Sequence, residues 1–362
     1  MSQRNNVVIR KLPSGVPGLD LILGGGVPEG SFNLIAGAPG TGKTTLAHQF
    51  VFENATPERT ALFFTVLGEP AVKMLRHQQQ YTFFDAKKVD ESIRFINLSD
   101  DVMERGLNGA LERIIEEVER AGAGIVVVDS FRSLAGSTAP DSDGRSGLPG
   151  ALQRLAMHLT TWQVTSFLVG EYEEWDKTGN PVFTIADSII WLTQAADNNS
   201  VVRKLHVVKV RGQAPMPGLH TYRNTDGGLL VFPRLALAVN ERDRETPAGR
   251  AQTGVPGLDE MMGGGIPSGD SVLVAGPSGS GKSVLATQFI AEGGKQGEAG
   301  VLVVFEEHPK EYLYRADGFG FHLREMIEAG TLEALYLRPL DLSPDETLYE
   351  IREAVERVGA KR

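Results

Sequence analysis

The 362-residue chain has an ordinary globular composition, with 41% hydrophobic and 23% charged residues, and a formal net charge of −10 at pH 7. This acidic balance argues against non-specific binding to nucleic acid or anionic lipid. The chain has no cysteine, which excludes disulfide bonds and thiolate metal sites. We recognise neither a signal peptide nor an apolar run long enough to span a bilayer, so we expect a cytoplasmic protein.

The first motif in the chain is GAPGTGKT at residues 37–44, which matches the phosphate-binding loop G-x-x-x-x-G-K-[ST]. Residues 31–36 predict the strand that enters such a loop, and residues 45–53 predict the helix that leaves it. Backbone N–H groups of this loop enclose nucleotide phosphates, the Lys reaches the β- and γ-phosphates, and the Ser or Thr hydroxyl ligates Mg²⁺. Thr44 is the expected magnesium ligand. The expected nucleotide-binding residues are Gly40, Thr41, Gly42, Lys43, Thr44 and Thr45.

After this loop, apolar strands alternate with helical segments, which predicts a mostly parallel α/β sheet. The strand expected at residues 125–129 is apolar up to Asp129, as in a central parallel strand. Asp129 then lies at the carboxyl edge of the sheet and is the expected Walker B carboxylate for Mg²⁺. Alternatively, it only caps the following turn. The other expected strands are 61–66, 93–98, 166–170, 188–192, 201–210 and 228–232, and the expected helices are 72–81, 108–121 and 152–162.

The same pattern then occurs a second time. SGVPGLD at residues 14–20 is repeated as TGVPGLD at 253–259, and GGGVPEG at 24–30 is repeated as GGGIPSG at 263–269. Each pair is separated by 239 positions, as are Lys43 and Lys282. A repeat of this length indicates a duplicated domain. The expected organisation is a first domain at residues 1–243, a polar linker at 244–252 and a second domain at 253–362.

The second copy contains its own phosphate loop, GPSGSGKS at residues 276–283, with Ser283 as the expected magnesium ligand. The counterpart of Asp129 falls after residue 362, so we interpret the second copy as incomplete and the chain as a fragment. The expected nucleotide-binding residues are Gly279, Ser280, Gly281, Lys282, Ser283 and Val284. The expected strands are 271–275, 300–305 and 332–337, and helices are expected up to residue 293, after Pro309 and at 344–358.

Nucleotide hydrolysis also needs a group that orients or deprotonates the attacking water. In the second copy, Glu306 and Glu307 follow a predicted strand and are candidates for this role. In the first copy Leu67 and Gly68 take these positions, and only Glu69 remains nearby. The second copy therefore has the better catalytic carboxylates. Alternatively, Glu306 and Glu307 are solvated acids at a helix N-terminus, where the helix dipole favours them.

Together these motifs resemble the KaiC family of RecA-like P-loop ATPases over nearly the whole chain. The resemblance rests on the repeated glycine-rich segments, both phosphate loops, FEEHP at 305–309, VVVDS at 126–130 and KVRG at 209–212. It implies a duplicated RecA-like fold, ATP and Mg²⁺ as cofactors, and a homo-oligomeric, hexameric ring. In the family, the Lys and Arg of K-x-R-G reach the γ-phosphate held by the neighbouring protomer. This implies trans-acting roles for Lys209 and Arg211.

The function we expect is ATP binding and Mg²⁺-dependent hydrolysis that couples nucleotide state to signalling or to protein interaction. Three alternatives stay open: a Ser/Thr autokinase that uses the same loops, a nucleotide-gated interaction module without turnover, and a DNA-dependent recombinase, which the acidic charge disfavours. Gln213 and Pro215 depart from the family pattern, which has Thr and His there. The expected catalytic residues are Lys43, Glu69, Asp129, Lys209, Arg211, Lys282, Glu306 and Glu307.

Overall fold

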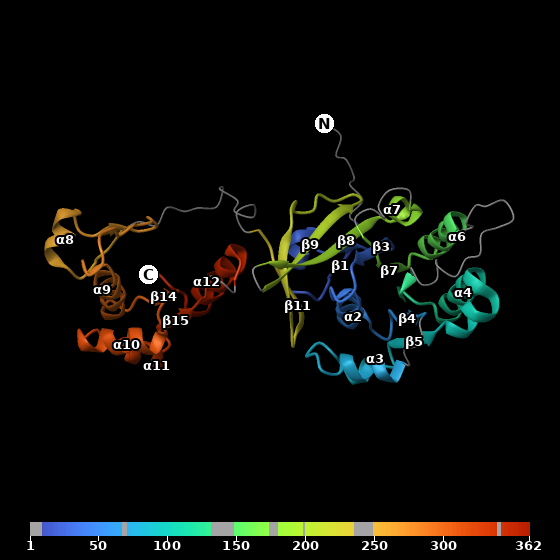
Figure 1. Ribbon diagram of the computed structural model, residues 1–362, viewed down its shortest axis with the longest axis horizontal. Coiled ribbons are helices and arrows are strands. Elements are labelled where there is room, and N and C mark those ends of the chain that lie inside the picture. The colour runs from blue at the N-terminus through green and yellow to red at the C-terminus, as the bar shows by residue number, and fades with distance from the viewer. Residues whose placement is uncertain are drawn as a thin grey trace, which may run out of the picture. The chain divides into compact units, whose positions relative to one another are not determined.

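A computed structural model describes residues 9–66, 71–131, 148–173, 180–197, 200–234, 249–338 and 342–362. The chain forms two compact units, Met1–Arg234 and Leu235–Arg362. Figure 1 shows the first unit in blue to yellow and the second in orange to red. Part of the expected linker, residues 244–248, lies outside the described residues.

The first unit is built on a sheet of nine strands among its described residues, in the order β11-β10-β9-β8-β3-β7-β6-β4-β5. From β8 to β5 neighbouring strands pair in parallel, whereas β9, β10 and β11 extend the sheet in antiparallel pairing. This confirms the α/β class with a mostly parallel sheet. The strands are β3 (Phe32–Gly37), β4 (Ala61–Thr65), β5 (Ile93–Asn97), β6 (Ile125–Asp129), β7 (Thr165–Glu171), β8 (Ser188–Asp197), β9 (Ser200–Val210), β10 (His220–Thr225) and β11 (Gly228–Phe232).

Strand β4 is apolar up to Thr65 and β6 up to Asp129, as expected where both faces of a sheet are buried. Phe63 and Val127 belong to one hydrophobic core, and the next residues, Phe64 and Val128, belong to the other. This alternation follows from the two-residue period of a strand. Helix α2 packs on the first core, and α4 and α6 pack on the second. The helices are α1 (Leu19–Leu23), α2 (Lys43–Asn54), α3 (Ala71–Gln78), α4 (Ser99–Ala121), α6 (Leu148–Thr161) and α7 (Pro181–Ile185).

Helix α4 begins nine residues earlier than the expected helix at 108–121. Gly106 has non-helical backbone angles inside it (φ 63°, ψ −158°), so the element is two helical segments joined at a kink. The sequence pattern predicts only the segment after the kink, which contributes the buried Leu111 and Ile114. The kink interrupts the 3.6-residue period on which the prediction relies.

In the second unit, two strands pair in parallel, with Val304 opposite Tyr336. The helix expected at 344–358 is present as α12, and a capping box at Ser343 and Glu346 begins it. The elements are α8 (Pro256–Met261), α9 (Lys282–Lys295), β14 (Gly300–Val304), α10 (Pro309–Gly318), α11 (Leu323–Glu328), β15 (Leu332–Tyr336) and α12 (Pro344–Val358). Short antiparallel pairs also occur in both units: β1 (Lys11–Leu12) with β2 (Val27–Pro28), and β12 (Arg250–Ala251) with β13 (Ile266–Pro267).

The strand predicted at residues 271–275 is wrong, because this segment has no regular secondary structure. Its apolar side chains, Val272, Leu273 and Val274, are 54%, 89% and 41% exposed. The matching strand of the first unit, β3, is hydrogen-bonded to β7 on one side and to β8 on the other. The repeat places the counterparts of β7 and β8 after residue 362, and among the described residues no strand pairs with this segment.

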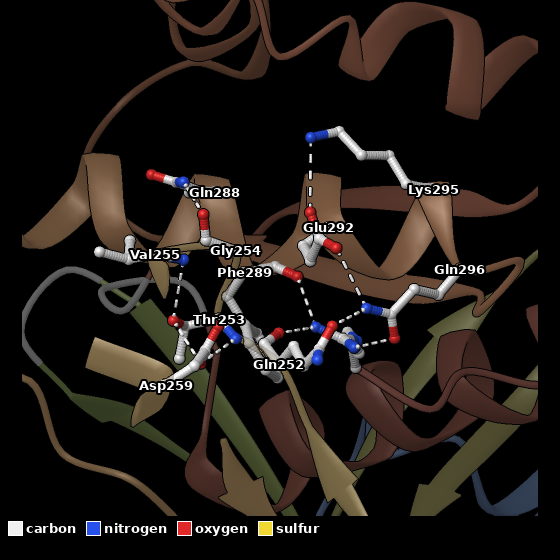
Figure 2. Close-up of polar contacts among 11 residues, drawn as sticks. Gln252, Thr253, Gly254, Val255, Asp259, Gln288, Phe289, Glu292, Lys295 and Gln296 are labelled. Carbon is white, nitrogen blue, oxygen red and sulfur yellow. Dashed lines mark hydrogen bonds and ion pairs between the residues drawn. The ribbon is translucent and has the colours of Figure 1, made fainter. Parts of the chain in front are cut away.

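The glycine-rich segment before each phosphate loop packs on the helix that follows the loop. In the second unit, Asp259 accepts a hydrogen bond from the Thr253 N–H at 2.8 Å, and Gln288 of α9 donates to the Gly254 carbonyl at 2.5 Å (Figure 2). These contacts explain why the repeated segment ends in Asp. The first unit has the same contacts 239 positions earlier: Asp20 with Ser14 at 2.9 Å, and Gln49 with Gly15 at 3.4 Å.

Gly18, at the start of α1, is expected to be essential for the stability of the first unit. Its φ is +82°, and a Cβ there would lie 2.0 Å from the Val231 carbonyl oxygen of β11. We therefore expect Gly18→Ala to lower the free energy of unfolding by roughly 2–4 kcal/mol. Denaturation followed by tryptophan fluorescence measures this, because all three Trp residues precede residue 235.

The matched control is Gly122→Ala. Gly122 has a φ of +58°, but among the described residues no atom lies within 4 Å of the position that a Cβ would take there. Only the backbone cost of about 1 kcal/mol therefore applies to this variant. Equal unfolding midpoints for the two variants would contradict the steric explanation.

Candidate nucleotide-binding site

The first phosphate loop connects β3 to α2, as the motif requires. Thr41 Oγ1 donates to the Ala38 carbonyl at 2.8 Å, and the Tyr222 hydroxyl of β10 donates to the Thr41 carbonyl at 2.6 Å. Burial raises the pKa of Tyr222, so its hydroxyl remains a donor. These two hydrogen bonds hold the loop backbone in place, one from within the loop and one from the antiparallel part of the sheet.

Thr44 and Asp129, the two expected magnesium ligands of the first unit, are brought together. Thr44 Oγ1 donates to Asp129 Oδ2 at 2.6 Å, although β3, which leads into the loop before Thr44, is separated from β6 by β7. Both groups offer oxygen atoms, the ligands that Mg²⁺ prefers. The described residues include no cluster of three or more His, Cys, Asp or Glu side chains able to bind a metal. Nucleotide phosphates and water would therefore supply the other ligands, as is usual for Mg²⁺.

Lys43 lies in a buried position between acidic groups. Its side chain is close to the loop, where Nζ donates to the Ala38 carbonyl at 2.8 Å. Burial lowers the pKa of Lys43, while the carboxylates of Glu171 and Asp129 act in the opposite direction. Glu171 ends β7, in register with Gly37 at the start of the loop. The site thus combines one cation with two carboxylates at the carboxyl edge of three adjacent strands.

Two residues of this site are not predicted from the sequence. Glu171 follows an apolar strand, which is the signal that identifies Asp129, but the predicted strand ends at residue 170. Tyr222 lies on β10, which is not predicted as a strand. The sequence of β10, HTYRNT, is too polar to be recognised by hydrophobic pattern.

Lys209 and Arg211 lie near each other, around the carboxyl end of α7. Lys209 Nζ donates to the Phe183 carbonyl at 2.8 Å, and Arg211 donates to Asp187 at 2.9 Å and to the Thr184 carbonyl at 3.2 Å. Burial and the neighbouring Arg211 lower the pKa of Lys209. The Arg211 side chain remains 61% exposed.

These two cations are not brought to the phosphate loop of their own chain. Lys209 pairs with Ile189 of β8, which pairs with Leu34 of β3. The loop begins three residues farther along β3, at Gly37, which is about 10 Å along the strand at ~3.3 Å per residue. Arg211 follows Lys209 toward the opposite edge of the sheet.

The second phosphate loop precedes α9 and has the same internal contact as the first. Lys282 Nζ donates to the carbonyls of Gly276 and Pro277 at 2.9 and 2.8 Å, as Lys43 does to Ala38. The repeat places the counterpart of Asp129 after residue 362, outside the given sequence.

The candidate catalytic glutamates lie beyond strands that end at the nucleotide edge. In the first unit Thr65, the last residue of β4, pairs with Asp129, but Glu69 itself lies outside the described residues. In the second unit Glu306 and Glu307 follow β14, and Glu307 accepts a hydrogen bond from Arg315 at 2.5 Å. The two acids therefore have different surroundings.

Comparison with known proteins identifies the family. A family model described as "ATPase: KaiC" matches residues 12–236 and again residues 251–362. The chain belongs to the KaiC family. This confirms both the resemblance drawn from the motifs and the duplication, and KaiC-family proteins are ATP-binding P-loop ATPases. None of the helices in the described parts of the chain is long and apolar enough to cross a membrane.

Curated relatives include three KaiC proteins of cyanobacteria. The circadian clock oscillator protein KaiC of Prochlorococcus marinus (strain MIT 9313) is 27% identical over 365 residues, 99% of this chain and 72% of that protein. KaiC 1 of Synechocystis sp. is 28% identical over 366 residues, covering 98% and 69%. KaiC of Synechococcus elongatus is 27% identical over 354 residues, covering 96% and 67%.

His48 makes the phosphate-loop helix sensitive to acid. It lies one turn after Thr44, its Nδ1 donates to the Thr44 carbonyl at 2.7 Å, and its ring stacks on Phe63 at 4.3 Å. Burial lowers the pKa of this fully buried imidazole to about 4. Between pH ~6.5 and pH 4, His48 therefore binds a proton in the unfolded state but stays neutral in the folded state.

We expect the first unit to lose up to about 3 kcal/mol of stability through His48 as the pH falls from 6.5 to 4. His48→Thr, which introduces the residue found at position 287 of the second unit, should remove this part of the pH dependence. Denaturant titrations at pH 7 and pH 4.5 measure it. A variant with the same pH slope as the wild type would show that His48 is not the cause.

Proposed function

We propose that this chain binds ATP and Mg²⁺ at its first unit and hydrolyses ATP slowly at the interfaces of a ring of protomers. The observation that carries this proposal is the hydrogen bond of 2.6 Å between Thr44 and Asp129. It brings a hydroxyl and a carboxylate to the place where a P-loop ATPase holds its metal ion. The relatives are named as circadian clock oscillator proteins; for this chain we propose only nucleotide-dependent signalling through protein interaction.

Each residue of the first loop has a separate role in this proposal. The backbone N–H groups from Gly40 to Thr45 bind the phosphates, and Lys43 leaves the Ala38 carbonyl to contact the β- and γ-phosphates. Thr44 and Asp129 hold Mg²⁺, which when bound neutralises charge on the phosphates. Glu69 is our candidate for orienting the attacking water.

We assign Lys209 and Arg211 to the nucleotide of the neighbouring protomer. Their distance from the loop of their own chain supports this assignment, as does the exposure of Arg211. A cation placed at the γ-phosphate stabilises the charge that develops during transfer. Asp187 and the carbonyls of α7 would hold both side chains in position until a neighbour is bound.

The second unit is proposed to bind nucleotide through residues 279–284, with Lys282 on the phosphates and Ser283 on Mg²⁺. Glu306 and Glu307 are its candidate catalytic acids. In the first unit a hydroxyl and a carboxylate for Mg²⁺ are in direct contact, so we assign turnover to the first unit. A second candidate function, a nucleotide-gated module without turnover, is favoured by Gly68 at the position that corresponds to Glu307.

Single-loop variants test the assignment of turnover. Lys43→Ala should reduce phosphate release by about 100-fold or more, because the variant loses the lysine cation that stabilises the negative charge of the phosphates. Lys282→Ala, its matched control in the second loop, should leave release near the wild-type rate. The measurement uses ATP labelled on the γ-phosphate, with Mg²⁺ present.

The fate of the label separates the remaining alternatives. Free labelled phosphate indicates hydrolysis, label retained on the protein indicates autophosphorylation, and binding without either indicates a nucleotide-gated module. Equal loss of phosphate release in both variants would contradict turnover at the first unit alone.

A further inference from the structure

We propose that three side chains of the second unit, Thr287, Tyr312 and Arg315, form a relay that positions Glu307 according to the state of the second phosphate loop. Thr287 lies on α9, the helix that follows the loop, and Tyr312 and Arg315 lie on α10. The inference rests on the proposed binding of nucleotide by the second unit. It adds positioning residues that no sequence motif contains.

The first part of the relay runs from the loop helix to α10. Thr287 Oγ1 donates to the Ser283 carbonyl at 2.6 Å, and the Tyr312 hydroxyl lies 2.5 Å from Thr287 Oγ1. Because a carbonyl only accepts, the Thr287 proton is already used, and Tyr312 must be the donor to Thr287. Thr287 and Tyr312 are only 5% and 7% exposed, so water competes little for these hydrogen bonds.

The second part runs from Tyr312 to the glutamate. The guanidinium of Arg315 lies 5.6 Å from the centroid of the Tyr312 ring and donates to Glu307 at 2.5 Å. Tyr312 and Arg315 are three residues apart on one helix, so they share a face. An ion pair with side chains 50% and 26% exposed is weak by itself, but the ring limits where the guanidinium can lie.

Glu307 follows the strand that corresponds to β4, close to where the attacking water would lie in the proposed site. The repeat aligns Val304, the last residue of β14, with Thr65 of β4, and Thr65 pairs with the magnesium carboxylate Asp129 in the first unit. Glu307 therefore follows its strand at the edge where nucleotide binds. The relay connects Ser283, the proposed magnesium ligand, with a candidate catalytic acid across two helices.

The first unit differs from the second at three of these four positions and keeps an arginine at the fourth. Where the second unit has Thr287, it has His48, whose ring stacks on Phe63 instead of contacting a tyrosine hydroxyl. Where the second unit has Glu307, it has Gly68. The hydroxyl relay and the glutamate that it would position thus occur together in one copy and are both replaced in the other. Lys73 stands at the position of Tyr312, and Arg76 stands at the position of Arg315.

Hydrogen exchange of the full chain, with and without Mg²⁺ and a non-hydrolysable ATP analogue, tests the relay. In the wild type we expect the nucleotide to slow exchange at residues 276–287 and also at 305–315. Tyr312→Phe keeps the ring but removes the hydroxyl, so protection at 276–287 should remain while protection at 305–315 falls by about two- to tenfold.

Variants at Thr287 and Tyr314 distinguish an effect of the relay from a general loss of packing around Tyr312. Thr287→Val should behave as Tyr312→Phe does, whereas Thr287→Ser, which keeps the hydroxyl, should restore wild-type protection at 305–315. Tyr314→Phe is the matched control, because the Tyr314 side chain is 79% exposed and the same atom is removed.

The outcomes distinguish the relay from the proposed function. Wild-type protection at 305–315 in Tyr312→Phe, with the loop protected, would overturn the relay alone. If the nucleotide protects neither segment of the wild type, binding by the second unit is overturned, and the relay with it.

Discussion

The hydrogen bond between Thr44 and Asp129 depends on the order of the central strands of the first unit. It requires β3, β7 and β6 to lie side by side in parallel register, so that the helix that follows the loop after β3 can place Thr44 at the end of β6. That register requires strands buried on both faces, which the unbroken apolar sequence of β6 supplies. The contact between Thr44 and Asp129 is therefore a consequence of how the sheet is ordered.

The second unit shows which elements of this fold depend on neighbouring residues and which depend on residues far away in the sequence. Its phosphate loop and α9 form with the same lysine contact as in the first unit, because a glycine-rich loop followed by a helix depends on neighbouring residues. The strand expected before that loop does not form, because a parallel strand depends on partners far away in the sequence. Leu273, in the middle of this segment, is 89% exposed.

The same distinction explains how much could be predicted from the sequence. The strand at 125–129, the strand at 228–232 and the helix at 344–358 were predicted with their observed ends, because hydrophobic pattern and capping residues define them locally. Tyr222 could not be found, since a polar strand is recognisable only beside its neighbours. The contacts among Thr287, Tyr312 and Arg315 depend on how α9 packs against α10, which no spacing in the sequence encodes. The roles proposed for Lys209 and Arg211 come from the family resemblance, and the hydrophobic pattern of the sequence does not indicate them.

We propose that one protomer supplies the phosphate loop and its neighbour supplies the cations. Co-expression of Lys43→Ala chains with Arg211→Ala chains, both carrying Lys282→Ala, tests it through the rate of ATP hydrolysis. Each chain alone should be nearly inactive, whereas in a randomly mixed ring about a quarter of the interfaces combine an intact loop with an intact arginine and should recover activity. A mixed assembly no more active than the two separate variants would contradict the claim.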